Sequence, residues 1–276
     1  MPRAMQKQSS FPNNPVVAFV RAVGRNVIAW LSEMGAMAIF MLHGMSRMLS
    51  SPKQVPKVIR QVYIIGAGSF FLIALIALFT GMVLGLQGYY TLTKFGSEGF
   101  LGAAVALTLI RELAPVLTAI MVTGRAGSAM AAEIGVMRIT DQIDALEVMD
   151  INSMGYLVSP RITASLIAFP LLTAIFTVIG IIGGYVTGVL LLGISQGIYF
   201  SRIESSVVWA DIVGCFSKSI AFALIVVAVC CYKGYFAHMR KDGMGAEAVG
   251  NATTSAVVLS CILLLVADYV LTSFLL

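Results

Sequence analysis

The stretch GRAGSAMAAEIGVMRITDQIDALEVMD, residues 124–150, interrupts a very apolar chain with a regular series of charges. The charged side chains in it are those of Arg125, Glu133, Arg138, Asp141, Asp144, Glu147 and Asp150. The whole chain of 276 residues is 59% hydrophobic and 11% charged, with a mean hydropathy of +0.93. Soluble domains carry about 25% charged residues. The composition therefore predicts an integral membrane protein.

Five apolar stretches are each long enough to cross the hydrocarbon core of a membrane, which takes roughly 20 helical residues. They cover 62–90, 101–123, 160–193, 209–232 and 254–276. The first and third are longer than a straight span needs and rich in glycine, so we expect tilting, kinking or partial re-entry there. Glycines that repeat every four residues, at 81 and 85 and at 180, 184 and 188, indicate close helix packing. The predicted fold class is an all-α integral membrane protein.

The residues before the first span have a different character. Residues 1–15 are polar and rich in proline, which predicts a flexible tail, and residues 16–61 predict an amphipathic helix followed by a basic linker. The least charged part of that helix, 34–45, is shorter than the roughly 20 residues that a span requires. An interfacial helix is therefore favoured over a spanning one. The remaining domain, 62–276, holds the five predicted spans.

Lysine and arginine predict the orientation of the chain. Residues 1–61 contain eight basic side chains and a single acidic one, Glu33, and the loop at 233–253 adds three more basic residues. The positive-inside rule therefore places the N-terminus, the segment 124–159 and the loop 233–253 in the cytoplasm. Five spans then place the C-terminus on the outer side.

The charged segment also has a helical pattern. We expect Thr140 to cap a short helix, with acidic residues on one stripe and apolar residues on another. The acidic stripe is Asp141, Asp144 and Glu147, and the apolar stripe is Ile143, Leu146 and Met149. A solvated cytoplasmic loop and a docking helix for a soluble partner both fit this pattern. The chain has no phosphate-binding GxxxxGK[ST] motif, so any ATP hydrolysis would belong to another subunit.

Four charges lie within the predicted spans. Arg111 and Glu112 fall near the centre of the second span, and Lys218 and Asp268 lie at a comparable depth in the fourth and fifth. Each such charge costs roughly 2.5–3.5 kcal/mol on insertion scales, so each needs a partner or a wet cavity. Depth matching predicts an ion pair between Lys218 and Asp268. Arg111 suits a phosphate headgroup because its planar fork can donate two hydrogen bonds, although a buried structural ion pair is the alternative.

The stretch RELAPVLTAIMVTGRAGSAMAAEIGVMRITDQIDALEVM, residues 111–149, closely resembles the signature of the MlaE/YrbE family. These proteins are permease subunits of MCE-type ATP-binding-cassette lipid transporters in bacterial envelopes. The resemblance implies a homodimer in the inner membrane of a Gram-negative bacterium, with a phospholipid held between the two copies. It also implies a separate ATPase subunit, which binds ATP and Mg and docks on the cytoplasmic helix. A hexamer of MCE-domain proteins is implied on the periplasmic side, and a STAS-domain protein is implied to bind the ATPase.

With that resemblance, the candidate site residues fall into two groups. The lipid-binding group comprises Arg111, Glu112, Leu92, Phe95, Leu113, Val116 and Leu117. The ATPase-coupling group comprises Arg125, Glu133, Arg138, Asp141, Asp144, Leu146 and Glu147. We expect no metal site, no cofactor bound by this chain, no nucleic-acid partner and no enzymatic chemistry of its own. The rival functions are a stand-alone ion-coupled secondary transporter and a membrane scaffold without transport activity.

Overall fold

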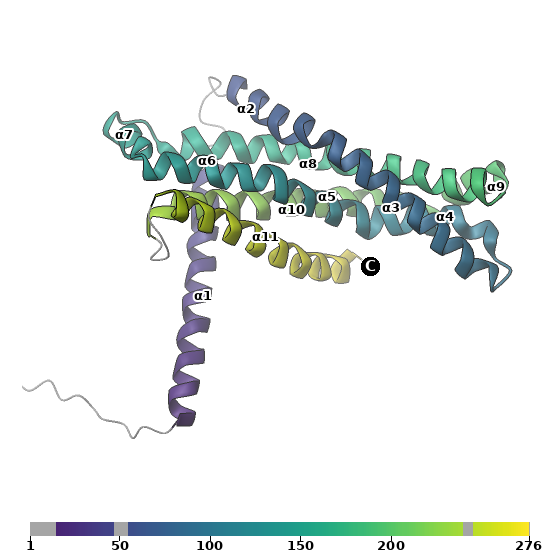
Figure 1. Ribbon diagram of the computed structural model, residues 1–276, viewed down its shortest axis with the longest axis horizontal. Helices are drawn as coiled ribbons and strands as arrows, with labels where there is room; N and C mark the ends of the chain where they lie inside the picture. Colours follow the sequence, from purple (N-terminus) through teal and green to yellow (C-terminus); the bar gives the residue numbers. More distant parts are fainter. Residues whose placement is uncertain (1–14, 47–54, 240–244, 276) are drawn as a thin grey trace, which may run out of the picture.

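The computed structural model describes residues 15–46, 55–239 and 245–275, and this part of the chain is helical with no strand. Its long helices lie side by side in an elongated bundle, and α1 (Pro15–Ser46) runs across their common direction (Figure 1). The predicted tail, apart from Pro15, and linker residues 47–54 lie outside the described residues. The all-helical fold class is confirmed.

The first long helix begins earlier than the apolar stretch at 62. Pro56 lies in its first turn, where the missing N–H of proline leaves no helical bond unmade. A π turn then separates two α-helical parts. They are α2 (Val55–Val62), η2 (Tyr63–Ala67) and α3 (Gly68–Thr93).

The second long helix runs well past the predicted end at 123. Alanine is frequent in 124–139 and no proline interrupts it, so the helix continues through the first half of the charged segment. It contains two π turns, η4 and η5. Its parts are η3 (Glu98–Phe100), α4 (Leu101–Thr108), η4 (Leu109–Leu113), α5 (Ala114–Val122), η5 (Thr123–Gly127) and α6 (Ser128–Ile139).

The short helix α7 (Gln142–Val148) follows at one end of the bundle (Figure 1). Its N-cap is Asp141, which adopts the left-handed conformation with φ of 56°. Thr140 ends α6 instead, and its hydroxyl donates to the Val136 carbonyl at 2.8 Å. The expectation that Thr140 caps the short helix is therefore wrong, because the second long helix extends to Ile139.

The remaining chain forms the third, fourth and fifth spans. Their helices are α8 (Ser153–Tyr185), continued by the π turn η6 (Val186–Leu191), then α10 (Trp209–Tyr235), η7 (Ala237–Met239) and α11 (Ala246–Leu275). Between the third and fourth spans lies α9 (Gln196–Ser206), which the sequence pattern did not predict. Tyr199 fixes α9 in place, because its buried hydroxyl donates to the Ile181 carbonyl at 3.1 Å. Burial raises the pKa of Tyr199.

Among the described residues, α3 and α8 share the most extensive helix–helix interface, and their backbones approach closely at glycines. A Cβ atom on Gly81 would lie 1.9 Å from the Gly180 carbonyl oxygen, and one on Gly183 would lie 2.3 Å from the Leu78 oxygen. The glycine repeats therefore pack against each other within one chain.

Six helices of the described chain are long and apolar enough to cross a membrane. Five of them match the predicted spans, and the sixth is the part of α1 from Val23 to Ser46. The chain is therefore a multi-pass membrane protein, whether α1 spans the membrane or lies at its surface.

The glycine contact makes a prediction about stability. Gly81→Ala forces the α3 and α8 backbones apart, so we expect a clear loss of stability, seen as a lower midpoint of thermal unfolding in mild detergent. Gly250→Ala is the matched control, because a Cβ there meets nothing within 4 Å. In a helix, that control substitution should be neutral or stabilising by about 0.5–1 kcal/mol. Equal midpoints for the two variants would contradict the close approach.

Candidate functional site

Charged side chains meet inside the bundle where η4, α10 and α11 come together. We call this cluster the polar centre. It consists of Arg111 and Glu112 from η4, Asp211 and Lys218 from α10, and Asp268 and Thr272 from α11.

Lys218 is the hub of the polar centre, and its side chain is only 3% exposed. Its Nζ donates to Glu112 Oε2 at 2.9 Å and to Thr272 Oγ1 at 2.7 Å, and it lies 3.2 Å from Asp268 Oδ1. It also donates to the Arg111 carbonyl at 2.8 Å, within a π turn whose bonding departs from the α-helical ladder. Lys218 therefore contacts Asp268, the residue that depth matching paired with it, and a second carboxylate as well.

Arg111 forms a separate ion pair with Asp211. Its Nε donates to Asp211 Oδ1 at 2.8 Å, and the arginine side chain stays 40% exposed while the aspartate is 9% exposed. Sequence reasoning missed Asp211, because it lies at the very start of the fourth apolar stretch. The available signal was its spacing of seven residues from Lys218, which places both side chains on one face of α10.

The cavity within the polar centre has a volume of about 50 Å³ and is lined in part by Arg111, Glu112, Lys218 and Thr272. It has room for water molecules and is too small for a phospholipid headgroup. The polar centre is therefore a packed ion network with Arg111 and Glu112 at its exposed edge. A phosphate would meet it from the surface, at Arg111.

The apolar residues of the predicted lipid site do not form one pocket. Leu92 lines a groove of about 310 Å³ between α3 and α4, and Phe95 lies beyond it in the connecting turn, 76% exposed. Leu113, Val116 and Leu117 lie further along the second long helix, half-buried against the core.

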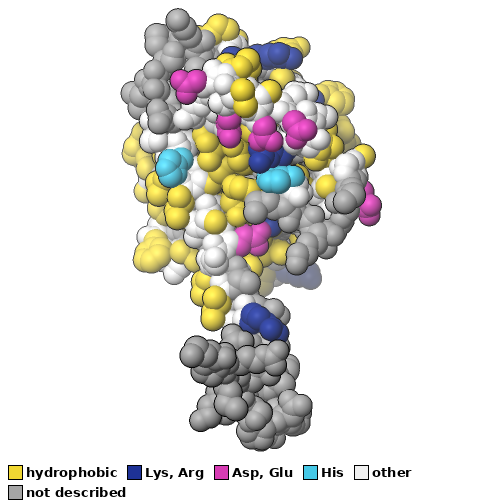
Figure 2. Space-filling model, turned by 90° about the vertical axis from the view of Figure 1, so that its left-hand side faces the viewer, with side chains coloured by type: hydrophobic (Ala, Val, Ile, Leu, Met, Phe, Trp, Pro, Cys, Tyr) yellow, Lys and Arg dark blue, Asp and Glu magenta, His cyan; other side chains and the backbone are white. Residues whose placement is uncertain are grey.

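The end of the bundle that carries α7 shows acidic side chains grouped near two histidines and an apolar area (Figure 2). Arg138 binds this end together, because its Nη1 donates to Asp144 at 2.6 Å and its Nε donates to His238 at 3.0 Å. Glu147 accepts hydrogen bonds from Tyr235 at 3.0 Å and Ser153 at 3.1 Å. Two acids of the predicted stripe thus hold α7 against α6, α8 and α10.

The apolar stripe of α7 divides between the two sides of the helix. Ile143 is fully buried and Leu146 packs against the core, whereas Met149 is 60% exposed. Val148 beside it is 88% exposed, and Asp141 is exposed as well. The outer face of α7 is therefore a small apolar patch next to an acid.

Two residues of the predicted coupling group lie away from α7. Glu133 Oε2 accepts a hydrogen bond from Arg161 at 2.8 Å, which joins α6 to α8. Arg125 reaches sideways to the first long helix, where its Nη1 donates to Ser69 Oγ at 3.1 Å. Neither side chain joins the contacts of Asp144 and Glu147 that hold α7, which we call the α7 cluster.

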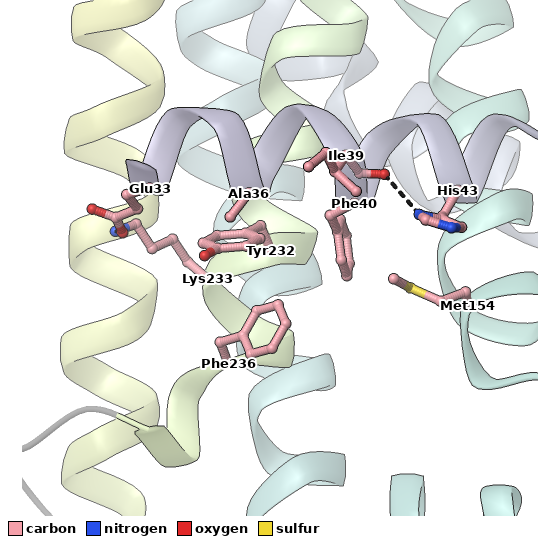
Figure 3. A pocket seen from close by; sticks show the side chains of 9 residues that line it. All are labelled: Glu33, Ala36, Ile39, Phe40, His43, Met154, Tyr232, Lys233 and Phe236. Atoms are coloured by element: carbon pink, nitrogen blue, oxygen red, sulfur yellow. Dashed lines mark hydrogen bonds and ion pairs between the residues drawn. The ribbon is translucent and has the colours of Figure 1, made fainter. Parts of the chain in front are cut away.

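A larger pocket of about 730 Å³ lies under α1 at the same end of the bundle. Figure 3 shows Phe40 from α1 pointing toward Tyr232 of α10 and toward Phe236, the residue after that helix, with Glu33 and Lys233 at one side. Glu33 and Lys233 form an ion pair, and the rings of Phe40 and Tyr232 meet edge to face. The second half of α1 is therefore anchored to the end of α10.

The polar centre makes a prediction about its hub. Lys218→Met leaves two carboxylates without their cation, whereas Asp268→Asn leaves Lys218 paired with Glu112, so Lys218→Met should cost more stability. Breaking a buried pair costs about 3–5 kcal/mol. The double variant Lys218→Met with Asp268→Asn should recover part of that loss. Thermal unfolding in mild detergent tests this, with Lys233→Met as a control at an ion pair whose acid is more exposed. Strictly additive losses would contradict the coupling.

Comparisons with a family model and with known proteins agree on one family. The family model described as Permease MlaE matches residues 58–274. The intermembrane phospholipid transport system permease protein MlaE of Haemophilus influenzae is 39% identical over 262 residues, covering 94% of this chain and 97% of that protein. A probable ABC transporter permease protein of Rickettsia bellii is 38% identical, covering 91% of this chain and 95% of its own length. The chloroplastic protein TRIGALACTOSYLDIACYLGLYCEROL 1 of Arabidopsis thaliana is 36% identical, covering 76% of this chain and 58% of its own length. The chain therefore belongs to the MlaE permease family.

Proposed function

We propose that this chain is the membrane subunit of an ATP-binding-cassette transporter that moves phospholipid between the inner membrane and the periplasm or outer membrane. Such transport would maintain the lipid asymmetry of the envelope. The observation that carries this proposal is the polar centre, a charged cluster inside an apolar bundle with Arg111 at its exposed edge. The relative from Haemophilus influenzae is named for intermembrane phospholipid transport, which supports the same substrate class.

In this proposal Arg111 receives the phosphate of the headgroup. Asp211 holds the guanidinium through Nε, and the side chain keeps enough exposure for its terminal nitrogens to donate to a phosphate in the two-pronged manner that arginine favours. Two copies of the chain hold the lipid between them, with Leu92, Phe95, Leu113, Val116 and Leu117 contributing apolar walls for the acyl chains. Glu112 accepts a hydrogen bond from Lys218 and limits how deeply the headgroup can enter the bundle.

The outer face of α7 is the proposed docking surface for a separate ATPase subunit. The bonds of Arg138 and Glu147 fix α7 to the ends of three long helices, so a force applied to α7 passes directly to the bundle. The exposed Val148, Met149 and Asp141 suit a partner groove that takes an apolar ridge beside an acid. ATP and Mg would be bound by that partner and not by this chain.

The distribution of lysine and arginine orients the assembly. It favours α7 and the N-terminus in the cytoplasm and the C-terminus in the periplasm. The direction of α1 across the bundle supports an interfacial position for that helix (Figure 1). A hexamer of MCE-domain proteins on the periplasmic side and a STAS-domain protein bound to the ATPase complete the proposed assembly.

Purification from the native membrane tests the ATPase partner. We expect the tagged protein in mild detergent to bring down a stoichiometric ATPase subunit and an MCE-domain protein, identified by mass spectrometry. Val148→Asp combined with Asp141→Lys should remove the ATPase, because both side chains are exposed on α7. Ile198→Asp is the matched control, since it alters a half-exposed apolar residue on α9 at the opposite end of the bundle. Purification of the wild type without any ATPase would favour an ion-coupled secondary transporter instead.

Lipid analysis of the same preparation tests Arg111. Arg111→Gln should lower the amount of co-purified phospholipid about tenfold, as expected for the loss of charge-assisted hydrogen bonds. Because that change leaves Asp211 unpaired, the double variant Arg111→Gln with Asp211→Asn separates lipid binding from folding. Unchanged lipid content in the double variant would exclude Arg111 as the headgroup site.

A further inference from the structure

Arg125 lies in η5, fourteen residues beyond Arg111 on the same long helix. At a rise of 1.5 Å per residue this separation is about 21 Å along the helix axis, toward the end that carries α7. Arg125 therefore lies at a different depth from the polar centre. Its side chain is exposed and points away from the α7 cluster, toward the first long helix.

The guanidinium of Arg125 lies close to the backbone at Gly68, which has no side chain. Nη1 donates to Ser69 Oγ at 3.1 Å and to the Ile64 carbonyl at 3.4 Å, where η2 meets α3. A Cβ atom on Gly68 would lie 2.5 Å from Nη1 and 2.7 Å from Nη2, so only glycine leaves room for the group in this position. The Arg125 side chain thus joins two π turns, its own η5 and η2, which holds Ile64.

Among the described residues, no carboxylate lies within hydrogen-bonding distance of the Arg125 guanidinium. Arg111, Arg161, Lys218 and Lys233 each have a carboxylate oxygen within hydrogen-bonding distance. For Arg125, the hydrogen-bond acceptors among the described residues are a hydroxyl and a carbonyl, which are neutral. Arginine near the end of a spanning helix suits a phosphate at the membrane surface, because its planar fork can donate two hydrogen bonds. The described residues thus leave this guanidinium open to an anion from outside the chain.

The side chains next to this contact are apolar and exposed. On α3, residues three, four and seven positions beyond Gly68 share its face, and these are Phe71, Leu72 and Leu75. They are 77%, 37% and 44% exposed, respectively. They extend from Arg125 toward the middle of the bundle. An anion at Arg125 would thus have an apolar track directly beside it.

We infer that Arg125 is a second headgroup site, which binds the phosphate of a phospholipid in the leaflet on the α7 side, with the acyl chains along Phe71 and Leu75. A lipid in that leaflet has this orientation, with its phosphate at the membrane surface and its chains toward the centre. The inference rests on the proposed function, because it concerns the same class of substrate. It assigns Arg125 to lipid binding in place of ATPase coupling.

Site-specific photocrosslinking tests this assignment. The full transporter is produced in its native membrane with p-benzoylphenylalanine in place of Phe71, irradiated, and analysed by mass spectrometry for phospholipid attached to the chain. Arg125→Gln should lower the yield of attached phospholipid about tenfold, as expected for the loss of charge-assisted hydrogen bonds. Gly68→Ala keeps the charge but displaces the guanidinium, which is the flexible end of its side chain, so it should lower the yield without unfolding the protein.

A photoreactive residue in place of Phe274 is the matched control, because Phe274 is 85% exposed but lies on α11. Its yield of attached lipid should be the same with and without the changes at Arg125 and Gly68. An undiminished yield at position 71 in Arg125→Gln would overturn the assignment. A crosslink from position 71 to a second copy or to a partner subunit in place of lipid would overturn it too.

Inorganic phosphate distinguishes a lipid site from a general anion site. Excess inorganic phosphate should leave the yield at position 71 unchanged, and complete displacement of the lipid would show a small-anion site and contradict the inference. The assay needs neither ATP nor the ATPase subunit. Absence of an ATPase partner would therefore refute the proposed transporter. The crosslinking test of Arg125 could still be interpreted in that case.

Discussion

Lys218 and its oxygen partners hold the central part of the bundle. An ammonium group that is 3% exposed within apolar helices must be compensated, and here the compensation comes from two carboxylates, a hydroxyl and a carbonyl. Those oxygens belong to η4 and α11, whereas Lys218 belongs to α10. The second, fourth and fifth spans are consequently fixed in rotation and in depth at one level. Arg111 and Glu112 both lie at the exposed edge, where Asp211 holds the guanidinium and Lys218 holds the carboxylate.

A second set of polar contacts organises the end of the bundle that carries α7. Arg138 and Glu147 attach α7 to the long helices, and the ion pair of Glu33 with Lys233 attaches α1 to α10. Both attachments end near the same turn of α10, because Tyr235 contacts Glu147 while Tyr232 contacts Phe40. The contacts of α7 and those of α1 therefore meet at the end of α10.

Hydropathy predicted the five spans, and the signature at 111–149 predicted the family, because both depend on long stretches of sequence. The end of the second helix was placed too early for a physical reason. Charges at 125–138 suggest exposure to water, yet Glu133 and Arg138 are satisfied by neighbouring helices, and the helix simply continues. Helix α9 was missed because it is short and is fixed by a tertiary contact of Tyr199. Asp211 was missed because it lies at the very start of the fourth apolar stretch, outside the depth at which the other charges were matched.

The π turns carry a consequence for how this family can vary. A π turn contains one residue more than the α-helical turn that it replaces, and η4, η5, η2 and η6 each hold such a residue within a spanning helix. The wider turn takes up that residue, so its loss would leave a regular α-helix whose side chains beyond the turn keep nearly the same faces. At η4 the change would fall on Arg111 and Glu112 themselves, because both lie inside the π turn. Length changes of a single residue at these four points would thus alter the side chains of one turn without breaking any helix.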